Sequence, residues 1–299
     1  MLRRETLPRV LLLLAALVFF SANTVYFFED GGQEILASVD TSCHFDFDNV
    51  RDKGPYLNVK SAILVNYENG EVVYTKNPEK TRPVASLTKL VSAMVILDHG
   101  VDLNQTEKIT KEDARRSSRS RLRVGFEMSL IDLMHSSLMC SDNRATRALA
   151  RATCGSIEEF TREMNAKVKS LGLDNTIFYE PTGLDERNVS TAHEIAKILH
   201  YAYDYDLIRE ITSKRYHRAK IVNRKNSFRQ MGNTNRLIYS PYKVLGGKTG
   251  YIIEADYCLA TLLQNKEGEM LTLVVLGAPG DKIRFKEARK LANWGFRQV

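Results

Sequence analysis

A serine and a lysine three residues apart could act together as a nucleophile and its base. Ser86 and Lys89 open an apolar run that continues to Leu97, before Gly100 supplies a helix stop signal. Because residues three apart share one face of a helix, the hydroxyl and the amine can come within hydrogen-bond reach. A charged, unpaired lysine is costly in such an apolar helix, whereas a neutral lysine can take the serine proton. The alternative is a capping serine beside a surface lysine.

Two later motifs complete a recognisable set with this pair. They are Ser141-Asp142-Asn143 and Lys248-Thr249-Gly250. The ordered trio Ser-x-x-Lys, Ser-Asp-Asn and Lys-Thr-Gly is the signature of penicillin-recognising serine enzymes. Each motif alone is a weak signal, because a pattern as short as Ser-x-x-Lys arises readily by chance. The three together are highly specific.

With these motifs the sequence resembles the penicillin-binding proteins, specifically the small D-alanyl-D-alanine peptidases. The resemblance covers roughly residues 61–294. Three other stretches are also similar to that family: residues 120–125 (Ser-Arg-Leu-Arg-Val-Gly), 181–184 (Pro-Thr-Gly-Leu) and 233–235 (Asn-Thr-Asn). The resemblance implies a β-lactamase/transpeptidase-like fold, with a five-stranded antiparallel sheet covered by helices and a helical subdomain.

The resemblance also implies a role for each matching residue. Ser86 would attack the carbonyl between two D-alanines while Lys89 takes its proton, and the backbone N–H groups of Ser86 and Tyr251 would form the oxyanion hole. Ser141 would pass a proton to the departing amine. Asn143, the fourth catalytic residue, would hold the substrate amide and Lys89. The substrate-binding residues would be Lys248, Thr249, Gly250 and Tyr251. We also expect a fixed positive charge on Lys248, which would help to keep Lys89 neutral.

Other functions remain alternatives at this point. Ser-Asp-Asn is also the form found in class A β-lactamases, and Glu180-Pro181 lies at a spacing near the glutamate that activates water in those enzymes. An anchored wall-binding or penicillin-sensing module that acylates without turnover is a third interpretation. The chain ends 49 residues past Gly250, which suits a short peptidase that cleaves cross-links, but carboxypeptidase and endopeptidase activities both remain open. Expected partners are peptidoglycan and, as covalent inhibitors, β-lactam antibiotics.

Nucleotide and metal binding are not indicated. A phosphate loop would need a glycine at Tyr242 and would open a helix, whereas the segment around Lys248 is rich in β-formers. Residues 46–49 lack the glycine and the glutamate of a calcium loop. The six histidines are isolated from one another. We therefore predict no metal and no cofactor.

Composition places the chain among globular proteins. Of its 299 residues 43% are hydrophobic and 26% are charged, which leaves room for one large domain or two modest ones. The formal net charge of +7 suggests anionic surroundings, although it looks spread through the chain with a local peak at residues 115–123. No aromatic-interleaved basic motif indicates nucleic acid.

The amino terminus indicates export. Arg3, Arg4 and Arg9 precede 19 mainly apolar residues, Val10 to Phe28. This length nearly spans a membrane, and the arginines favour a cytoplasmic amino end. We predict a signal peptide or, preferably, a signal anchor at residues 1–28, followed by a tether at 29–58 and a catalytic domain at 59–299. The domain would lie in the periplasm or at the outer face of the cytoplasmic membrane.

Local patterns predict the elements that position these motifs. Residues 62–67 and 71–76 form a hairpin around Asn69-Gly70. Helices follow, including Arg144 to Cys154 and two that open at the capping boxes of Ser156 and Thr191. Strands are expected at 243–249, 257–263 and 271–277, and a closing helix at 282–294. Early strands, middle helices and late strands favour an antiparallel sheet covered by helices.

Four cysteines in an exported protein permit two disulfides without establishing any. Cys140 and Cys154 bracket a helix whose length places them on the order of 15 to 20 Å apart, so a bond between them is not expected. Cys43 and Cys258 cannot be placed from sequence.

Overall fold

The protein is described here from a computed structural model, which describes residues 20–21, 24–28, 34–37, 43–48, 50, 54–115 and 120–299. The chain divides into two compact units, Met1–Ser42 and Cys43–Val299. In the first, β1 (Phe20–Ser21), β2 (Thr24–Phe28) and β3 (Glu34–Ala37) form an antiparallel sheet.

The predicted signal and tether lie largely outside the described residues. The described part of the apolar stretch forms short strands, and within the described ranges no helix is both long and apolar enough to cross a membrane. The export signal therefore stays a prediction.

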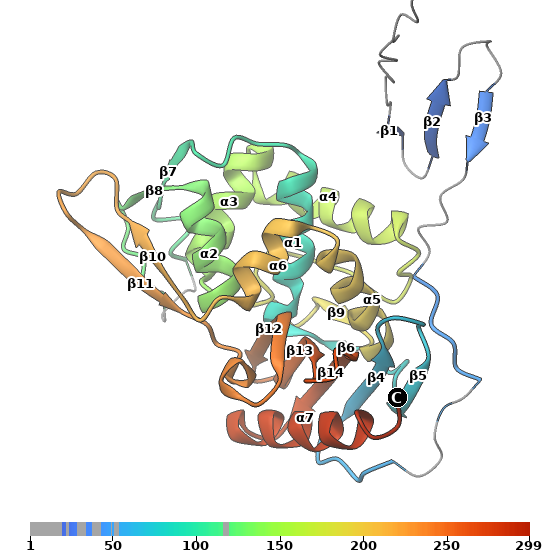
Figure 1. Cartoon of the computed structure of the whole chain (residues 1–299). Coiled ribbons are helices and arrows are strands. Elements are labelled where there is room, and N and C mark those ends of the chain that lie inside the picture. The colour runs from blue at the N-terminus through green and yellow to red at the C-terminus, as the bar shows by residue number, and fades with distance from the viewer. Residues whose placement is uncertain are drawn as a thin grey trace, which may run out of the picture. The chain divides into compact units, whose positions relative to one another are not determined.

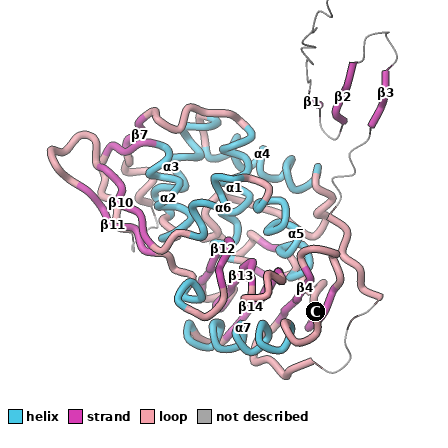
Figure 2. The backbone as a smooth tube through the Cα atoms, in the orientation of Figure 1, coloured by secondary structure: helices cyan, strands magenta, loops and turns pink. Residues whose placement is uncertain are grey.

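A five-stranded antiparallel sheet forms the centre of the second unit, in the order β12-β13-β14-β4-β5 (Figures 1 and 2). Its strands are β4 (Ser61–Asn66), β5 (Val72–Lys76), β12 (Lys243–Ile252), β13 (Asp256–Gln264) and β14 (Met270–Ala278). All five were predicted within a few residues. The order makes β12, which carries Lys248, an edge strand.

The sheet separates two hydrophobic cores, because successive strand side chains point to opposite faces. In β4, Ile63 packs into the core shared with the middle helices, whereas Leu64 packs with Phe285 and Leu291 of α7 (Asp281–Gly295). Figure 1 shows α7 lying across its face of the sheet. The predicted closing helix is thus confirmed.

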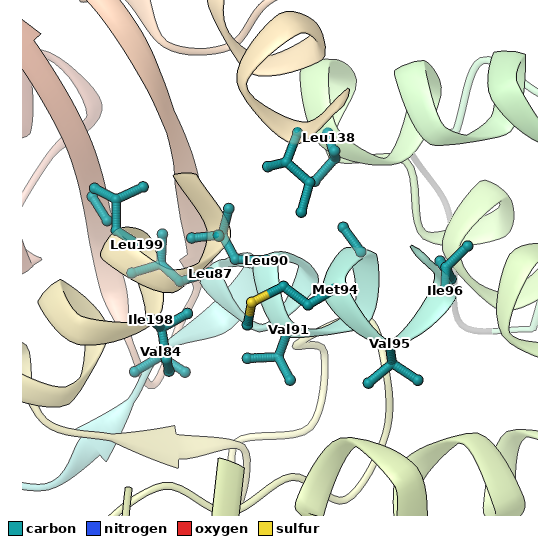
Figure 3. Close-up of a cluster of buried hydrophobic side chains, with 14 of the residues drawn as sticks. Val84, Leu87, Leu90, Val91, Met94, Val95, Ile96, Leu138, Ile198 and Leu199 are labelled. Atoms are coloured by element: carbon teal, nitrogen blue, oxygen red, sulfur yellow. The ribbon is translucent and has the colours of Figure 1, made fainter. Parts of the chain in front are cut away.

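The helical region packs on the opposite face around α1 (Lys89–Asp98), which is buried from Lys89 to Ile96. Figure 3 shows Leu90 and Met94 of α1 among side chains of neighbouring helices, including Leu138 and Ile198. Those neighbours are α2 (Leu130–Cys140), α3 (Asn143–Cys154), α4 (Ile157–Ser170) and α5 (Ala192–Tyr203), and α6 (Asp206–Ser213) packs on α2, α5 and β12. The predicted helix starts at Ser156 and Thr191 are confirmed, since each side chain accepts the backbone N–H of the residue three positions later.

Several short elements were not predicted. A 3-10 turn, η1 (Ala85–Thr88), precedes α1, so Ser86 lies in that turn and not in the α-helix itself. The other additions are β6 (Arg82–Pro83), β7 (Thr106–Lys108), β8 (Glu127–Ser129), β9 (Val189–Ser190), β10 (Tyr216–Lys220), β11 (Phe228–Gly232) and η2 (Arg236–Tyr239). The strands pair as β6 with β9, β7 with β8 and β10 with β11. All four cysteines are free thiols.

Candidate active site

Lys89 joins the elements of the site through its amine. The side chain is fully buried, and its Nζ lies 2.9 Å from Ser86 Oγ and 2.7 Å from Asn143 Oδ1, with a third hydrogen bond to the Thr182 carbonyl oxygen. Burial lowers the pKa of Lys89 to about 7. A neutral amine has two N–H groups and one lone pair. In the structure Nζ donates to Ser86 Oγ, and the Ser86 hydroxyl donates to the Thr182 carbonyl at 3.3 Å. When the amine is neutral, its lone pair can take the Ser86 proton, because Asn143 Oδ1 and the Thr182 carbonyl can only accept.

The backbone before Ser86 is strained and tightly enclosed. Ala85 has a φ of 49°, in the left-handed region that non-glycine residues seldom adopt. A Cβ on Gly183 would lie 1.9 Å from the Ala85 carbonyl oxygen, and one on Gly250 would lie 3.1 Å from Ser86 N. Two glycines therefore let the 181–184 loop and β12 approach the serine from different elements.

The 181–184 loop is held by groups that its sequence motif does not include. Glu180 Oε2 accepts hydrogen bonds from Thr182 N (2.9 Å) and Thr182 Oγ1 (2.6 Å), while Oε1 accepts from Leu184 N (2.7 Å). The Ser92 hydroxyl, one turn beyond Lys89, donates to the Pro181 carbonyl at 2.7 Å. These bonds aim the Thr182 carbonyl at Lys89.

The Ser-Asp-Asn motif forms the corner between α2 and α3. Ser141 has a φ of 59° and ends α2, and its hydroxyl has no hydrogen bond within the described part of the chain. Asp142 caps α3 through Arg144 N and Ala145 N, and its Oδ2 also accepts from Ser120 Oγ at 2.7 Å. Asp142 thus fixes the corner, which places Asn143 against Lys89.

Lys248 is buried in β12, and its Nζ donates to the carbonyl of Thr249 at 2.9 Å. Burial, followed by the charges of Lys89 and Arg284, lowers the pKa of Lys248 well below its usual value. Burial therefore opposes the expected positive charge on Lys248, and an anionic partner would favour it. Thr249 Oγ1 lies 2.7 Å from Thr234 Oγ1.

The β12 edge is supported from beneath by a residue that the motifs did not reveal. Arg284 of α7 donates to the carbonyl oxygens of Gly250 (3.0 Å) and Cys258 (3.2 Å) and pairs with Asp281. Tyr251, the next residue of β12, is 43% exposed, and its ring stacks on that of Tyr257 at 4.2 Å. An edge strand leaves alternate backbone groups unpaired, so β12 can offer N–H groups beside Ser86.

Comparison with known proteins agrees with this geometry. The D-alanyl-D-alanine carboxypeptidase family matches residues 48–280 of the chain. The chain belongs to this family. It is therefore a serine-type D-alanyl-D-alanine peptidase, as the resemblance implied.

Individual relatives support the same assignment. The chain is 36% identical to the D-alanyl-D-alanine endopeptidase of Escherichia coli (strain K12) over 80% of this chain and 78% of that protein. It is also 36% identical to the D-alanyl-D-alanine carboxypeptidase DacF of Bacillus subtilis (strain 168), over 80% and 62%. The crystal structure of the Streptomyces K15 DD-transpeptidase superposes with a TM-score of 0.76 at 27% identity, covering 82% of this chain and 99% of that one. The predicted transpeptidase-like fold is confirmed.

The eight predicted site residues of this peptidase fall into three groups. Hydrogen bonds connect Ser86, Lys89 and Asn143 directly. Lys248, Thr249, Gly250 and Tyr251 follow one another along β12, which reaches Ser86 through Gly250. Ser141 lies two residues before Asn143, without a bond to either catalytic side chain.

Sequence reasoning missed the carbonyl of Thr182, the buried Asn188 and Arg284. Asn188 Oδ1 accepts from Tyr179 N at 2.8 Å, and its Nδ2 donates to the Glu180 carbonyl at 2.7 Å. The only signal in the sequence was the similarity of residues 181–184 to the family. Within the described residues, no group of His, Cys, Asp and Glu side chains is arranged to hold a metal ion.

Proposed function

We propose that the chain hydrolyses D-alanyl-D-alanine bonds of peptidoglycan stem peptides or cross-links through an acyl-enzyme on Ser86. The observation that carries this proposal is the arrangement around Lys89, in which two accepting oxygens direct the lone pair of a neutral amine to the Ser86 hydroxyl. A pKa of about 7 leaves a large neutral fraction at neutral pH.

In acylation, Ser86 Oγ forms a bond to the carbonyl carbon of the first D-alanine while its proton passes to Lys89. The carbonyl π electrons move to oxygen, where the N–H groups of Ser86 and Tyr251 stabilise the charge. When the carbon–nitrogen bond breaks, the proton held by Lys89 reaches the departing amine by way of the Ser141 hydroxyl, so Ser141 keeps its hydroxyl and Lys89 becomes neutral again. Water then attacks the ester, releases the acid and restores the Ser86 hydroxyl.

Lys248 and Thr249 bind the substrate carboxylate in this proposal. A carboxylate beside the buried amine would raise the pKa of Lys248 and favour its charged form. Asn143 holds both the substrate amide and Lys89, which couples substrate position to the base.

The neighbourhood of Glu180 favours a peptidase over a β-lactamase. A glutamate that activates water needs a free carboxylate oxygen facing the acyl group, yet both oxygens of Glu180 accept loop N–H groups. The relatives include both endopeptidases and carboxypeptidases at 36% identity, so we propose the shared bond specificity and not one of the two activities.

We further propose that the protein is exported and acts on the cell wall, anchored by the N-terminal segment if that segment stays uncleaved. β-Lactam antibiotics would acylate Ser86 because their strained amide takes the place of the D-alanyl-D-alanine bond.

The test is covalent labelling. The purified protein is incubated with labelled penicillin, digested, and the modified peptide is mapped by mass spectrometry. Label on the peptide that contains Ser86, absent from Ser86→Ala, is the expected result. Unchanged labelling of Ser86→Ala would remove the assignment. Turnover of a D-alanyl-D-alanine peptide by the same preparation separates an enzyme from a module that only acylates.

A further inference from the structure

One hairpin carries a dense cluster of positive charge. Residues 214–232, which include β10 and β11, hold seven Lys or Arg and no Asp or Glu. This is a second local peak of positive charge, in addition to the one at residues 115–123. The seven are Lys214, Arg215, Arg218, Lys220, Arg224, Lys225 and Arg229. Within residues 43–48, 54–115 and 120–299, only Lys214 among them pairs with a carboxylate, that of Glu210.

The hairpin is fixed to the body by one face, which leaves the other face outward. His217 and Ala219 of β10 face α2, and His217 Nε2 lies 2.5 Å from Asp132 Oδ1. Side chains alternate along a strand, so Tyr216, Arg218 and Lys220 point away from α2. Figure 1 shows β10 and β11 extending from the helical region.

The outward face combines aromatic, cationic and amide groups around a hollow. Its cross-strand pairs are Arg218 with Gln230 and Lys220 with Phe228. The guanidinium of Arg218 lies over the Phe228 ring at 3.9 Å, and Tyr216 is 56% exposed. An open hollow of about 500 Å³ is lined by Tyr216, His217, Arg218, Phe228 and Gln230.

The base of the hairpin connects to two of the active-site motifs. After β11 the chain reaches Thr234, whose N–H donates to the Met139 carbonyl beside the Ser-Asp-Asn corner and whose hydroxyl meets Thr249. Arg121 donates through Nη1 to the Gln230 carbonyl, and its N–H donates to Asp142 Oδ2. A polymer held on the outward face would thus lie beside the residues proposed to bind the cleaved peptide.

We propose that this outward face docks carboxylate-bearing peptidoglycan next to the stem peptide being cleaved, an inference that rests on the proposed function. Arg218 and Lys220 pair with free stem carboxylates, and Tyr216 provides a platform for a sugar ring. The chemistry favours this partner over a lipid bilayer. Membrane-binding elements present Trp, Phe or Leu to the bilayer, whereas the exposed turn at 223–226 is Asn-Arg-Lys-Asn. In the described hairpin, Val222 is the one aliphatic residue exposed beside that turn.

The experiment compares two charge-reversed variants of the full chain. Arg218→Glu/Lys220→Glu reverses the outward face. Lys286→Glu/Arg289→Glu makes the same change in charge at exposed positions of α7, on the other side of the sheet. Binding to sacculi stripped of lipid and teichoic acid is measured by co-sedimentation between low and high salt. Sacculi whose carboxylates have been converted to amides serve as the uncharged probe.

We expect the hairpin variant to bind sacculi roughly tenfold more weakly at low salt, because two exposed ion pairs with stem carboxylates are replaced by like-charge repulsion. Wild-type binding falls with salt and on amidated sacculi, and the α7 variant binds as wild type. Penicillin acylation of Ser86 is unchanged in both variants. If the hairpin variant acylates normally and binds sacculi as well as wild type, the docking proposal is wrong and the proposed function is untouched. If the wild type itself does not acylate, the proposed function is wrong.

Two further outcomes would overturn the proposal. Equal weakening by both variants would show that net charge alone matters. If the hairpin variant loses binding to phosphatidylglycerol vesicles but still binds sacculi, the partner of the outward face is a bilayer. If the hairpin variant fails to acylate, the milder Arg218→Gln/Lys220→Gln variant replaces it in the binding assay. The salt series on the wild type is a second test, because salt-independent binding by the wild type rejects the docking face.

Discussion

Burial would let Lys89 act as the base that the proposed function requires. A solvated lysine is almost fully protonated at pH 7, whereas desolvation lowers the pKa of Lys89 to about 7. The neighbouring carboxylates of Glu180 and Asp142 act in the opposite direction and favour the charged form. The result is an amine with a large neutral fraction at neutral pH. Because Asn143 Oδ1 and the Thr182 carbonyl accept its N–H groups, its lone pair is available for the proton of the Ser86 hydroxyl.

The first prediction concerns pH. The neutral form of Lys89 is the base, and it grows as pH rises through the folded-state pKa, so acylation of Ser86 by penicillin should accelerate from pH 5.5 to 8.5 with a midpoint near 7. Lys89→Ala should remain folded and acylate about 10² to 10⁴ times more slowly. Stopped-flow measurement of acylation across this range is the check. A flat profile in the wild type would mean that another group takes the proton.

The second prediction concerns Lys248. Replacing it with Gln removes a charge-assisted contact worth about 1.5 to 3 kcal/mol, so kcat/KM for a peptide with a free terminal carboxylate should fall roughly 10- to 100-fold. An ester substrate without that carboxylate is the matched control and should be affected far less. Equal losses on both substrates would show that Lys248 supports the base and does not bind the carboxylate.

The sequence motifs point to the proposed reacting residues but not to the groups that position them. Ser86, Lys89 and Lys248 belong to motifs whose spacing carries their chemistry. The acceptor on Thr182 is a backbone carbonyl, which any residue has, and Arg284 acts from a helix 34 residues after Gly250. Such groups are defined by three-dimensional proximity alone, so no local pattern could reveal them.

At the scale of elements, the site depends on close contact between η1, the 181–184 loop and β12. Gly183 approaches the Ala85 carbonyl so closely that no side chain fits between the loop and the nucleophile turn. The third prediction tests this contact. Gly183→Ala should lower stability by about 1 kcal/mol for the left-handed backbone and by a further ~1 to 3 kcal/mol for the clash. It should also slow acylation, because the loop carries the Thr182 acceptor of Lys89.

Gly172→Ala is the matched control for that prediction. Gly172 has a φ of +66°, close to the +80° of Gly183, but beyond its chain neighbours no heavy atom lies within 4 Å of the point that an alanine Cβ would occupy. Gly172→Ala should therefore lower stability only by the cost of the left-handed backbone, and it should acylate at the wild-type rate. Thermal unfolding and acylation rates of the two variants provide the comparison. If both alanines behave alike, close packing at Gly183 does not matter to the site.

Elements with strong local signals were predicted, and those stabilised by tertiary contacts were not. Asn69-Gly70 indicated the β4–β5 hairpin, and Ser156 and Thr191 marked two helix starts. The β10–β11 hairpin escaped because its strands are rich in Lys and Arg, and one face is buried only by packing on α2. Propensity alone does not distinguish such a ribbon from a solvated loop.

At the scale of the whole molecule, the fold class followed from the order of strand and helix patterns, and the family resemblance supplied the number of strands. The position of the charge did not follow, because a net value of +7 does not reveal a cluster until residues 214–232 are counted separately. The two cores explain how the molecule holds the site. One core fixes α1 and the other fixes α7, and the sheet that carries β12 lies between them.

The last prediction separates a peptidase from a β-lactamase by the lifetime of the penicilloyl enzyme. Glu180 is enclosed by Thr182 and Leu184 and is not free to activate water, so the penicilloyl enzyme should persist for minutes or longer. D-alanyl-D-alanine peptides or cross-linked muropeptides should turn over in the same preparation. Glu180→Gln should not change the lifetime of the acyl group. It should slow acylation, because the glutamine NH2 group cannot accept the loop hydrogen bond that one glutamate oxygen accepts, and the loop is weakened. Mass spectrometry over time decides between the two, because a rapid return to the unmodified mass that Glu180→Gln blocks would identify a β-lactamase.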